Sequence, residues 1–416
     1  MITAELIVMT NVAKRYTYNV PEDLTVCEGQ TVEVLFGKRK CSGIVININL
    51  NATPPSYPLS DILSVNEKKG TLPASILQLI PWFAQHYCVS EYKAAQCIIG
   101  TKKYRSVQQE EKIEKTALEP LSKAQMEIYK TILLNKTQEH VLHGVTGSGK
   151  TQIYAHLAQQ TIANGKSVIL LIPEISLTPQ FTTFFSEQFN NVAVVHSGLT
   201  PKKKEEIWSQ CLDNSINIII GPRSALFMPL SNIGLIIIDE EHDNSYKQEN
   251  NPRYYTHDIA KERATFHNAT LIYGSATPSL ITFSKKHNKT ITYHQLTERF
   301  NNITMPKVHI LDLNQSLSNH IIHDTLLENI QTTLQKKQRV LILVNRRGYA
   351  SFLKCKKCKK TQDCPGCQTS YTYHSDGYFR CHKCLTVKKM THQCIYCNKH
   401  DVEFYGVAIQ KVATEL

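Results

Sequence analysis

The stretch HVLHGVTGSGKT, His140 to Thr151, decides the fold. It places a short apolar run directly before a glycine-rich turn, and the segment YAHLAQQTIA, residues 154–163, follows with apolar residues at helical spacing. A buried strand, a glycine loop and an amphipathic helix in this order are typical of α/β domains with a parallel sheet. The sequence therefore predicts an α/β protein built around this segment.

The glycine loop matches the pattern G-x-x-x-x-G-K-[ST]. Glycines are needed there because backbone N–H groups must approach phosphate oxygens closely at a helix N-terminus. The lysine would reach the β- and γ-phosphates and the final hydroxyl would bind Mg²⁺. A chance glycine-rich turn is the alternative, which the flanking strand and helix disfavour. The predicted nucleotide-binding residues are Gly144, Val145, Thr146, Gly147, Ser148, Gly149, Lys150 and Thr151.

The run LIIIDEEH, Leu235 to His242, brings carboxylates to the end of a second apolar run. Carboxylates at the C-terminal end of a buried parallel strand lie at the sheet edge where nucleotides bind. We expect Asp239 to hold the metal through water and Glu240 to position or deprotonate the attacking water. Alone, such an acidic cluster would more often be a solvated helix start; beside a phosphate loop, the catalytic interpretation is favoured.

Similar apolar runs continue on both sides of these two motifs. Doubly buried runs of this kind predict parallel strands covered by helices on both faces. GSATPS, Gly274 to Ser279, ends one such run in small hydroxyl residues suited to sensing the nucleotide, although a simple turn has the same composition. The expected strands are HVLHG, SVILLIP, VAVVHSG, INIIIG, LIIID, TLIYGSAT and VLILVNRRG.

The first hundred residues have a different character. Short β-type runs separated by Pro and Gly between Leu6 and Ile48 predict a small β-barrel or sandwich. Residues 76–95 turn to helical periodicity, with Pro81 expected near a helix start or at a break. We place the end of this domain near Gly100, and residues 101–120, charged and poor in large apolar side chains, are expected to be a linker or exposed helix.

The segment SYKQENNPRYYTH, residues 245–257, interleaves aromatic and basic side chains. This mixture can stack on bases and neutralise phosphates of single-stranded DNA, and Tyr246, Lys247, Arg253 and Tyr254 are the candidates for those contacts. A loop with structural tyrosines fits the composition equally well.

Eight of the 13 cysteines form four C-x-x-C pairs. Disulfides need an oxidising compartment, and redox centres use one such pair, so closed tetrahedral Zn²⁺ sites are favoured, with an iron–sulfur centre as the main rival. Eight thiolates complete two sites, but the spacing does not say which pairs share a metal. His382 is not expected to be a ligand. The ligands are Cys355, Cys358, Cys364, Cys367, Cys381, Cys384, Cys394 and Cys397.

Composition indicates an unexported, cytoplasmic protein. In 416 residues, 47 Lys plus Arg against 35 Asp plus Glu give a net charge of +12, which is typical of a protein with a polyanionic partner, although many basic proteins bind none. No export signal and no apolar stretch long enough for a membrane span is evident. The other five cysteines are expected to be reduced core thiols: Cys27, Cys41, Cys88, Cys97 and Cys211.

Taken together, these motifs resemble those of the primosomal replication-restart helicases, the primosomal protein N′ (PriA) family. The shared segments, in the family's order, are VPEDL, FGKRKCSGIV, HGVTGSGKT, LIPEISLTPQ, HSGLT, IIGPRSALF, IIIDEEHDNSYKQ, GSATPSL, NRRGYA and the four cysteine pairs. The resemblance implies an ATP- and Mg²⁺-dependent 3′–5′ DNA helicase that acts at stalled or recombination forks and helps reload the replicative helicase. Its implied partners are forked and single-stranded DNA, primosome and helicase-loading proteins and single-stranded DNA-binding protein, without a membrane and with a monomeric chain.

The resemblance also implies roles for regions of the chain. Residues 1–100 would hold the 3′ end of a DNA strand through Tyr16, Tyr18 and Lys38. Two Zn²⁺ ions would be nested, one on Cys355, Cys358, Cys394 and Cys397 and the other on Cys364, Cys367, Cys381 and Cys384. The expected domains are a RecA-like helicase lobe at 121–305, the start of a second lobe at 306–354, a zinc-binding insertion at 355–400 and the remainder at 401–416.

Three departures from the family pattern stand out. Thr17 replaces the family's Asp between two aromatic residues, which questions a carboxylate contact with a 3′ hydroxyl. Residues 101–120 are too few for the family's winged-helix domain. The second lobe is expected to be truncated at Leu416, as in a fragment, a split protein or a decaying gene. Two alternatives therefore remain: a non-catalytic DNA-binding remnant, and a zinc-stabilised nucleotide switch acting on proteins.

Overall fold

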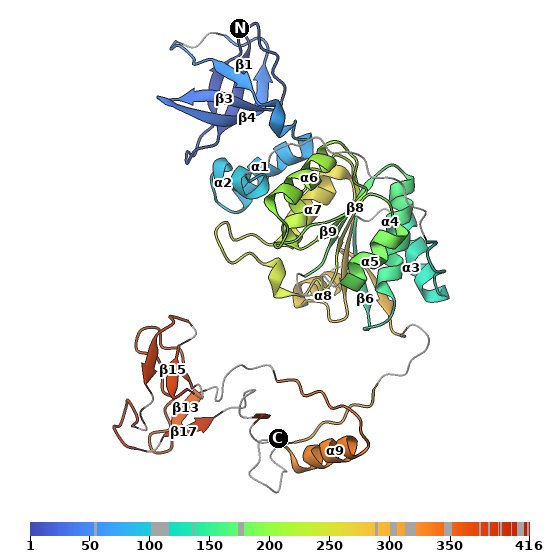
Figure 1. The fold of residues 1–416 in the computed structure, drawn as a ribbon, viewed down its shortest axis with the longest axis vertical. Helices are drawn as coiled ribbons and strands as arrows, with labels where there is room; N and C mark the ends of the chain where they lie inside the picture. The colour runs from blue at the N-terminus through green and yellow to red at the C-terminus, as the bar shows by residue number, and fades with distance from the viewer. Residues whose placement is uncertain are drawn as a thin grey trace. The chain divides into compact units, whose positions relative to one another are not determined.

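The computed structural model divides into two compact units, Met1–Met305 and Pro306–Leu416, each described here by itself (Figure 1). The structure describes residues 1–53, 56–100, 116–135, 138–173, 179–287, 290–299, 306–312, 322–344, 352–373, 376–381, 383–389, 391, 393–400, 402–405, 412, 413 and 416. Most of the expected linker, the segment NRRGYA and His382 lie outside these residues. Within them, no helix is both long and apolar enough to cross a bilayer.

The first unit begins with a five-stranded antiparallel sheet in the order β2-β1-β4-β3-β5. Leu6, Val32 and Val45 fill its core. Asn19, at the end of one edge strand, forms a bridge with Asp61, just before the other edge strand, so the sheet curls toward a closed barrel. The predicted β-rich domain is confirmed. Its strands are β1 (Thr3–Val8), β2 (Tyr16–Asn19), β3 (Thr31–Phe36), β4 (Arg39–Asn49) and β5 (Ile62–Val65).

A short 3₁₀ turn, η1 (Glu67–Lys69), leads into two helices, α1 (Ala74–His86) and α2 (Glu91–Ile98). Pro81 lies inside α1, so the expectation that it would start or break a helix was wrong. A proline in mid-helix loses one backbone hydrogen bond, but α1 buries an apolar stripe that includes Ile76 and Phe83, and tertiary packing holds the helix together. The Ser90 side chain caps α2 by accepting from the N–H of Lys93.

The remainder of this unit is an α/β lobe with a seven-stranded parallel sheet, ordered β12-β6-β11-β10-β7-β9-β8 among the described residues. Six of its strands match the predicted runs, and β12 was not predicted. The strands are β6 (Glu139–Gly144), β7 (Ser167–Leu171), β8 (Val192–Val194), β9 (Ile218–Gly221), β10 (Ile233–Ile238), β11 (Thr270–Ser275) and β12 (Thr292–Leu296).

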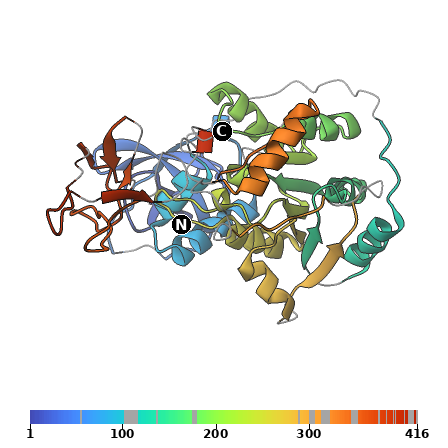
Figure 2. The same cartoon turned by 90° about the horizontal axis from the view of Figure 1, so that it is seen from below.

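Helices cover both faces of this sheet, as Figures 1 and 2 show. Successive residues of β7 enter different cores: Ile169 faces the side covered by α6, α7 and also α1, whereas Leu170 faces the side covered by α3, α4 and α5. The helical elements are α3 (Lys123–Leu134), α4 (Lys150–Ala163), α5 (Pro179–Gln188), α6 (Pro201–Leu212), η3 (Arg223–Phe227), η4 (Asn244–Tyr246), α7 (Thr256–His267) and α8 (Leu280–His287).

The second unit contains α9 (Asp324–Gln335) and a cysteine-rich module of short strands. The predicted strand VLILV, residues 340–344, is not a strand: Leu341 is 96% and Leu343 85% exposed. Its apolar pattern needs neighbouring strands to cover it, and none pairs with it in the described part of the unit. The module's strands are β13 (Phe352–Cys355), β14 (Thr372–Tyr373), β15 (Tyr378–Arg380), β16 (Val387–Lys389) and β17 (Val402–Tyr405).

Candidate functional site

The predicted phosphate loop joins β6 to α4 at the carboxyl edge of the sheet. Gly147 and Gly149 have φ of 80° and 78°, a left-handed conformation that favours glycine. A Cβ on Gly144 would lie 2.5 Å from Ser148 Oγ, so the tight wrap also needs glycine at its start. Lys150 Nζ donates to the Gly144 carbonyl at 3.1 Å and is thereby folded over the loop.

Two further features make this loop suitable for phosphate. Ser148 Oγ is buried and has no hydrogen-bond partner, and a buried hydroxyl of this kind is available for a hydrogen bond to a bound phosphate. Gln125, which the sequence analysis did not single out, donates through Nε2 to the Ser148 carbonyl at 3.0 Å. Gln125 also forms a capping box with Ser122 at the start of α3. The S-x-x-Q pattern was the signal that could have identified it.

Asp239 follows β10 and is held by two tyrosines. Its Oδ1 accepts from the Tyr154 hydroxyl at 2.9 Å, and its carbonyl oxygen accepts from the Tyr246 hydroxyl at 2.6 Å. Burial, with the nearby Glu240 carboxylate, raises the pKa of Asp239 to about 6, while Lys150 acts in the opposite direction. An anionic carboxylate beside the phosphate loop fits a hydrated divalent cation, which would itself lower that pKa.

Glu240 has a φ of 46°, an uncommon conformation for a residue with a side chain. His242 lies between it and β11: Nδ1 is 3.6 Å from Glu240 Oε2 and 2.8 Å from Ser275 Oγ. Ser275 Oγ in turn accepts from the N–H of Thr277. The acidic segment and the small-residue segment GSATPS are thus in direct contact, as a segment that senses the nucleotide requires.

Glu241, which sequence reasoning missed, is buried at the centre of a polar network. Its carboxylate accepts from the N–H of Ser279 at 2.6 Å and from the Thr282 hydroxyl at 2.9 Å, and it lies 3.1 Å from His257 Nε2. Burial alone would raise the pKa of Glu241, but His257 and the hydrogen bonds lower it. The charge is stabilised by donors from two separate segments, α7 and the start of α8, so Glu241 fixes their relative positions.

The aromatic loop 245–257 corrects two predicted DNA contacts. Tyr246 is 1% and Tyr254 4% exposed, and both belong to the core, so neither ring has a face free to stack on a base. The alternative interpretation, structural tyrosines, describes them. Lys247 and Arg253 are exposed, and Arg253 Nε donates to the Glu249 carbonyl at 3.1 Å.

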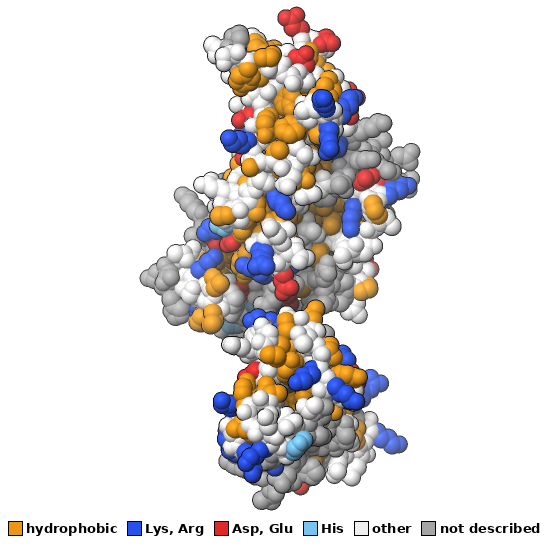
Figure 3. All heavy atoms as spheres, turned by 90° about the vertical axis from the view of Figure 1, so that its left-hand side faces the viewer, with side chains coloured by type: hydrophobic (Ala, Val, Ile, Leu, Met, Phe, Trp, Pro, Cys, Tyr) orange, Lys and Arg blue, Asp and Glu red, His pale blue; other side chains and the backbone are white. Residues whose placement is uncertain are grey.

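Of the three DNA-contact candidates in the N-terminal domain, one is buried and two remain accessible. Tyr18 is 4% exposed, and its hydroxyl donates to the Leu35 carbonyl at 3.0 Å, so its predicted DNA contact is corrected to a core role. Tyr16 is half-buried and packs edge-on against Phe36, with ring centroids 4.9 Å apart. Lys38 is exposed in the β3–β4 turn. Basic side chains are visible on this domain in the upper part of Figure 3.

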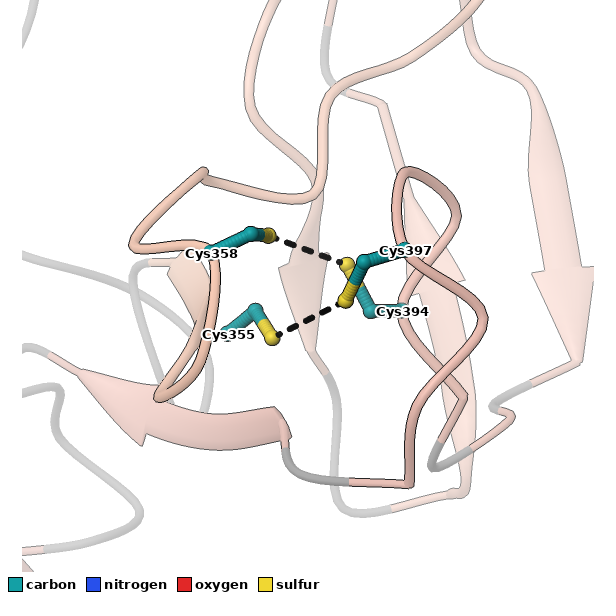
Figure 4. Close-up of side chains that lie close together, drawn as sticks. All are labelled: Cys355, Cys358, Cys394 and Cys397. Carbon is teal, nitrogen blue, oxygen red and sulfur yellow. Dashed lines mark hydrogen bonds between the residues drawn. The ribbon is translucent and has the colours of Figure 1, made fainter.

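The eight paired cysteines gather into two tetrads whose Sγ atoms lie within 4.8 Å of one another. One is drawn in Figure 4: Cys355 Sγ is 3.7 Å from Cys397 Sγ, and Cys358 Sγ is 3.6 Å from Cys394 Sγ. In the second, Cys364 Sγ is 3.5 Å from Cys384 Sγ and Cys367 Sγ 3.2 Å from Cys381 Sγ. Tetrahedral Zn²⁺ with ~2.3 Å Zn–S bonds would separate the sulfurs by ~3.8 Å, so both tetrads fit this ion.

The four C-x-x-C segments share one backbone conformation. In each, the N–H of the residue four positions after the first cysteine donates to that cysteine's carbonyl, as from Lys359 to Cys355 at 2.9 Å. The residue at this position has positive φ in all four: Lys359, Gln368, Leu385 and Asn398. Gln362, which lies between the first two segments, contacts the fourth by donating to Cys394 Sγ and accepting from the N–H of Ile395. The module therefore contains the same turn four times, an internal repeat of backbone structure that the sequence analysis had not recognised.

The remaining cysteines are less uniform than expected. Cys211 is buried, Cys41 and Cys97 are half-buried, and Cys27 and Cys88 are exposed. The expectation of five core thiols was therefore wrong for the two exposed residues. Scattered spacing and apolar neighbours in sequence do not determine which face of an element a cysteine occupies.

Comparison with known proteins identifies two parts of the chain. Residues 5–100 match the family model of the 3′DNA-binding domain (3′BD), and residues 122–284 match the DEAD/DEAH box helicase model. Among solved structures, RecG bound to a three-way DNA junction is similar at a TM-score of 0.39 and 18% identity, over 56% of this chain and 29% of that one.

Curated relatives extend over most of the chain. Replication restart protein PriA of Bacillus subtilis is 38% identical over 75% of this chain and 40% of its own length. Its counterpart in Rickettsia felis is 33% identical over 96% of this chain and 62% of its own length. The chain thus spans about half the length of the relatives it matches. Through its 3′DNA-binding domain, its helicase domain and these relatives, the chain belongs to the PriA family of replication restart proteins.

Proposed function

We propose that the protein is an ATP-dependent DNA helicase of replication restart, moving 3′ to 5′ on stalled or recombination forks and helping to reload the replicative helicase. The observation that carries the proposal is the meeting of the phosphate loop, Asp239 and Glu240 at one edge of a parallel sheet, in a unit that also contains a 3′DNA-binding domain. Single-stranded and forked DNA, single-stranded DNA-binding protein, and primosome and loading proteins are the proposed partners of a monomeric, cytoplasmic chain.

In this proposal each site residue has a defined task. The backbone N–H groups of the loop 144–151 bind the phosphates of ATP, and Lys150 leaves the Gly144 carbonyl to contact them. Thr151 and, through water, Asp239 would hold Mg²⁺, which supplies charge neutralisation of the phosphates. Glu240 orients the attacking water and accepts its proton. Tyr154 keeps the Asp239 carboxylate aimed at the loop.

Outside the ATP site, the proposal assigns binding and structural roles. The two cysteine tetrads hold structural Zn²⁺, since four thiolates leave no open position for a substrate. Tyr16, Lys38, Lys247 and Arg253 contact DNA; their exposed or half-buried side chains combine basic charge with an aromatic face. The proposed domains are 1–100 for DNA-end binding, 121–305 for the first helicase lobe, 306–354 for the start of the second lobe and 355–400 for the zinc module.

ATP turnover by the zinc-loaded chain, with and without forked DNA, tests the proposal. Turnover should rise with DNA and disappear in Lys150→Ala, while Lys202→Ala, an exposed lysine on α6, should behave as wild type. The apolar residues at 341–343 are exposed and pair with no strand in the described part of the second unit, so no second helicase lobe is formed there. This favours a second candidate, a DNA-binding protein without its own ATP turnover. DNA binding without turnover, and a Lys150→Ala variant with unchanged function in cells, would support that candidate.

A further inference from the structure

The two cysteine tetrads of the second unit belong to one small module. The outer tetrad, drawn in Figure 4, comes from the first and fourth C-x-x-C segments, and the inner tetrad comes from the second and third. The tetrads are separate groups of ligand atoms. A dependence of one metal site on the other therefore requires a residue that contacts the surroundings of both.

The side chain of Gln362 contacts the outer tetrad. Gln362 is 3% exposed; its Nε2 atom donates to Cys394 Sγ at 3.3 Å, and its Oε1 atom accepts from the N–H of Ile395 at 3.0 Å. The reverse orientation of the amide would set Nε2 against this N–H, so the donor faces the sulfur. A hydrogen bond to a thiolate stabilises its charge, and such partners orient metal ligands. The side chain thus fixes the position of Cys394.

The backbone of Gln362 is held by the core around the inner tetrad. Its N–H donates to the Leu353 carbonyl at 2.8 Å, and its carbonyl oxygen accepts from the N–H of Tyr371 at 3.0 Å. Leu353 and Tyr371 are buried in the same cluster as Cys364 and Cys381, two members of the inner tetrad. Because metal binding and local folding are linked, an ion held by the inner tetrad would also order the backbone of Gln362.

A second, weaker contact runs beside this one. Asp363 Oδ1 accepts from Ser370 Oγ at 2.8 Å, and Asp363 Oδ2 accepts from the Tyr396 hydroxyl at 3.3 Å. Tyr396 is 46% exposed, so water competes for its hydrogen bond, whereas the amide of Gln362 is enclosed. A hydrogen bond is electrostatically stronger in such a buried place. Gln362 is therefore the principal link between the two tetrads.

We propose that Gln362 is a positioning residue that couples the two metal sites: an ion in the inner tetrad raises the affinity of the outer tetrad for its own ion. The inference rests on the structural zinc role in the proposed function. Coupling is a free energy shared by two binding events and is reciprocal, so an ion in the outer tetrad must raise the affinity of the inner one by the same factor. A residue that supports the outer tetrad alone would change that affinity without producing this dependence.

The test uses the 416-residue chain and two single-site chains derived from it. Cys364→Ser with Cys381→Ser leaves the outer tetrad, and Cys355→Ser with Cys397→Ser leaves the inner one. Zinc association constants of the reduced chains are measured by competition with a chromophoric chelator. The coupling factor is the product of the two stepwise constants of wild type divided by the product of the two single-site constants. We expect a factor of about five or more, within the usual range for coupled sites.

Gln362→Met, introduced into all three chains, keeps the length of the side chain and removes its amide. The coupling factor should then fall close to one. Gln362→Asn, which withdraws the amide from Cys394 but keeps its polarity, is the second variant and should have the same effect. Gln393→Met is the matched control: this exposed glutamine directly precedes Cys394 but donates to the Asn398 carbonyl instead of a sulfur, and its variant should keep the wild-type factor.

Three results overturn the inference alone. A wild-type factor of one means that the sites bind independently. A wild-type factor that survives in both Gln362 variants means that this residue supports only the outer tetrad. Loss of the factor in Gln393→Met means that any change beside Cys394 has this effect. A wild-type chain that binds fewer than two zinc ions refutes the proposed zinc role, and the inference fails with it.

Discussion

The substitution Gly274→Ala tests how tightly the carboxylate at the end of β10 is enclosed. Gly274 lies in β11, and a Cβ at this position would be 1.7 Å from the Tyr154 hydroxyl and 3.1 Å from Asp239 Oδ1. Tyr154 is fully buried, so its ring has no free space to turn into. The added methyl group must displace the hydroxyl and break its hydrogen bond to Asp239.

Two costs add up in this variant. Overpacking a well-packed core costs about 1–3 kcal/mol, and a hydrogen bond to a charged group contributes about 1.5–3 kcal/mol. We therefore expect Gly274→Ala to lower the free energy of unfolding of the lobe by about 4 kcal/mol, and Tyr154→Phe, which loses only the hydrogen bond, by about 2 kcal/mol. Because the hydrogen bond can be lost only once, the double variant should cost at least about 2 kcal/mol less than the sum, and removal of the displaced hydroxyl oxygen relieves part of the overpacking as well.

Urea unfolding followed by Trp208 fluorescence measures these values. Trp208 is buried in the lobe, and a Trp82→Phe background makes it the sole tryptophan of the chain. Gly198→Ala is the control, since the added Cβ would meet only the His196 side chain, and it should change the free energy of unfolding by less than about 0.5 kcal/mol. Additive effects of Gly274→Ala and Tyr154→Phe would refute the reasoning.

Three further predictions concern charge, DNA and metal. Burial alone would raise the pKa of Glu139, but ion pairs with Lys261 at 2.7 Å and Lys285 at 3.4 Å lower it. The Glu139 carboxylate therefore stabilises the folded protein above the pKa that it has in the unfolded chain. This stabilisation is lost as the pH falls through the lower pKa of the folded state. Glu139→Gln should therefore lower the free energy of unfolding by about 1 kcal/mol at pH 7 and flatten its fall below about pH 4.5, and parallel pH curves would contradict this. Lys38→Ala should reduce the slope of the logarithm of the association constant for single-stranded DNA, plotted against the logarithm of the salt concentration, by about 0.7. A fluorescence titration measures this slope, and an unchanged slope would count against a phosphate contact of Lys38. Cys364→Ser should lower the zinc content, measured by atomic absorption, from about two ions per chain to about one, and retention of both would exclude this tetrad as a metal site.

The sequence was most informative where a single residue type is required by backbone geometry. The loop 144–151 could be predicted because glycine at 147 and 149 is needed for positive φ, and the buried strands because doubly covered strands are almost continuously apolar. The strand β12 was missed because TYHQL mixes polar and apolar residues: His294 is buried there against His140, 3.1 Å away. Buried polar pairs of this kind remove the hydrophobic signal.

Side-chain exposure was harder to predict than chain path. The tyrosines at 246 and 254 have the composition of a DNA-stacking loop, but Tyr246 donates to the Asp239 carbonyl and Tyr254 packs on Phe83, which is distant in sequence. Glu241 was overlooked because its donors come from segments that meet only in the folded chain. Local composition carries no information about such partners. The C-x-x-C spacing, by contrast, places two thiols close together within one short segment, and it was interpreted correctly as a source of paired thiols.

The arrangement of the two cysteine tetrads has a consequence for the order in which the module assembles. The inner tetrad closes the loop from Cys367 to Cys381, and the outer tetrad closes the longer one from Cys358 to Cys394, which contains it. Loop closure entropy grows with the logarithm of length, so closing the outer loop first costs about 0.8 kcal/mol more. Once the inner tetrad has formed, the outer thiols are already brought closer together. Folding of the module from its centre outward is therefore the favoured kinetic route, and a metal-starved chain should lose the outer closure before the inner one.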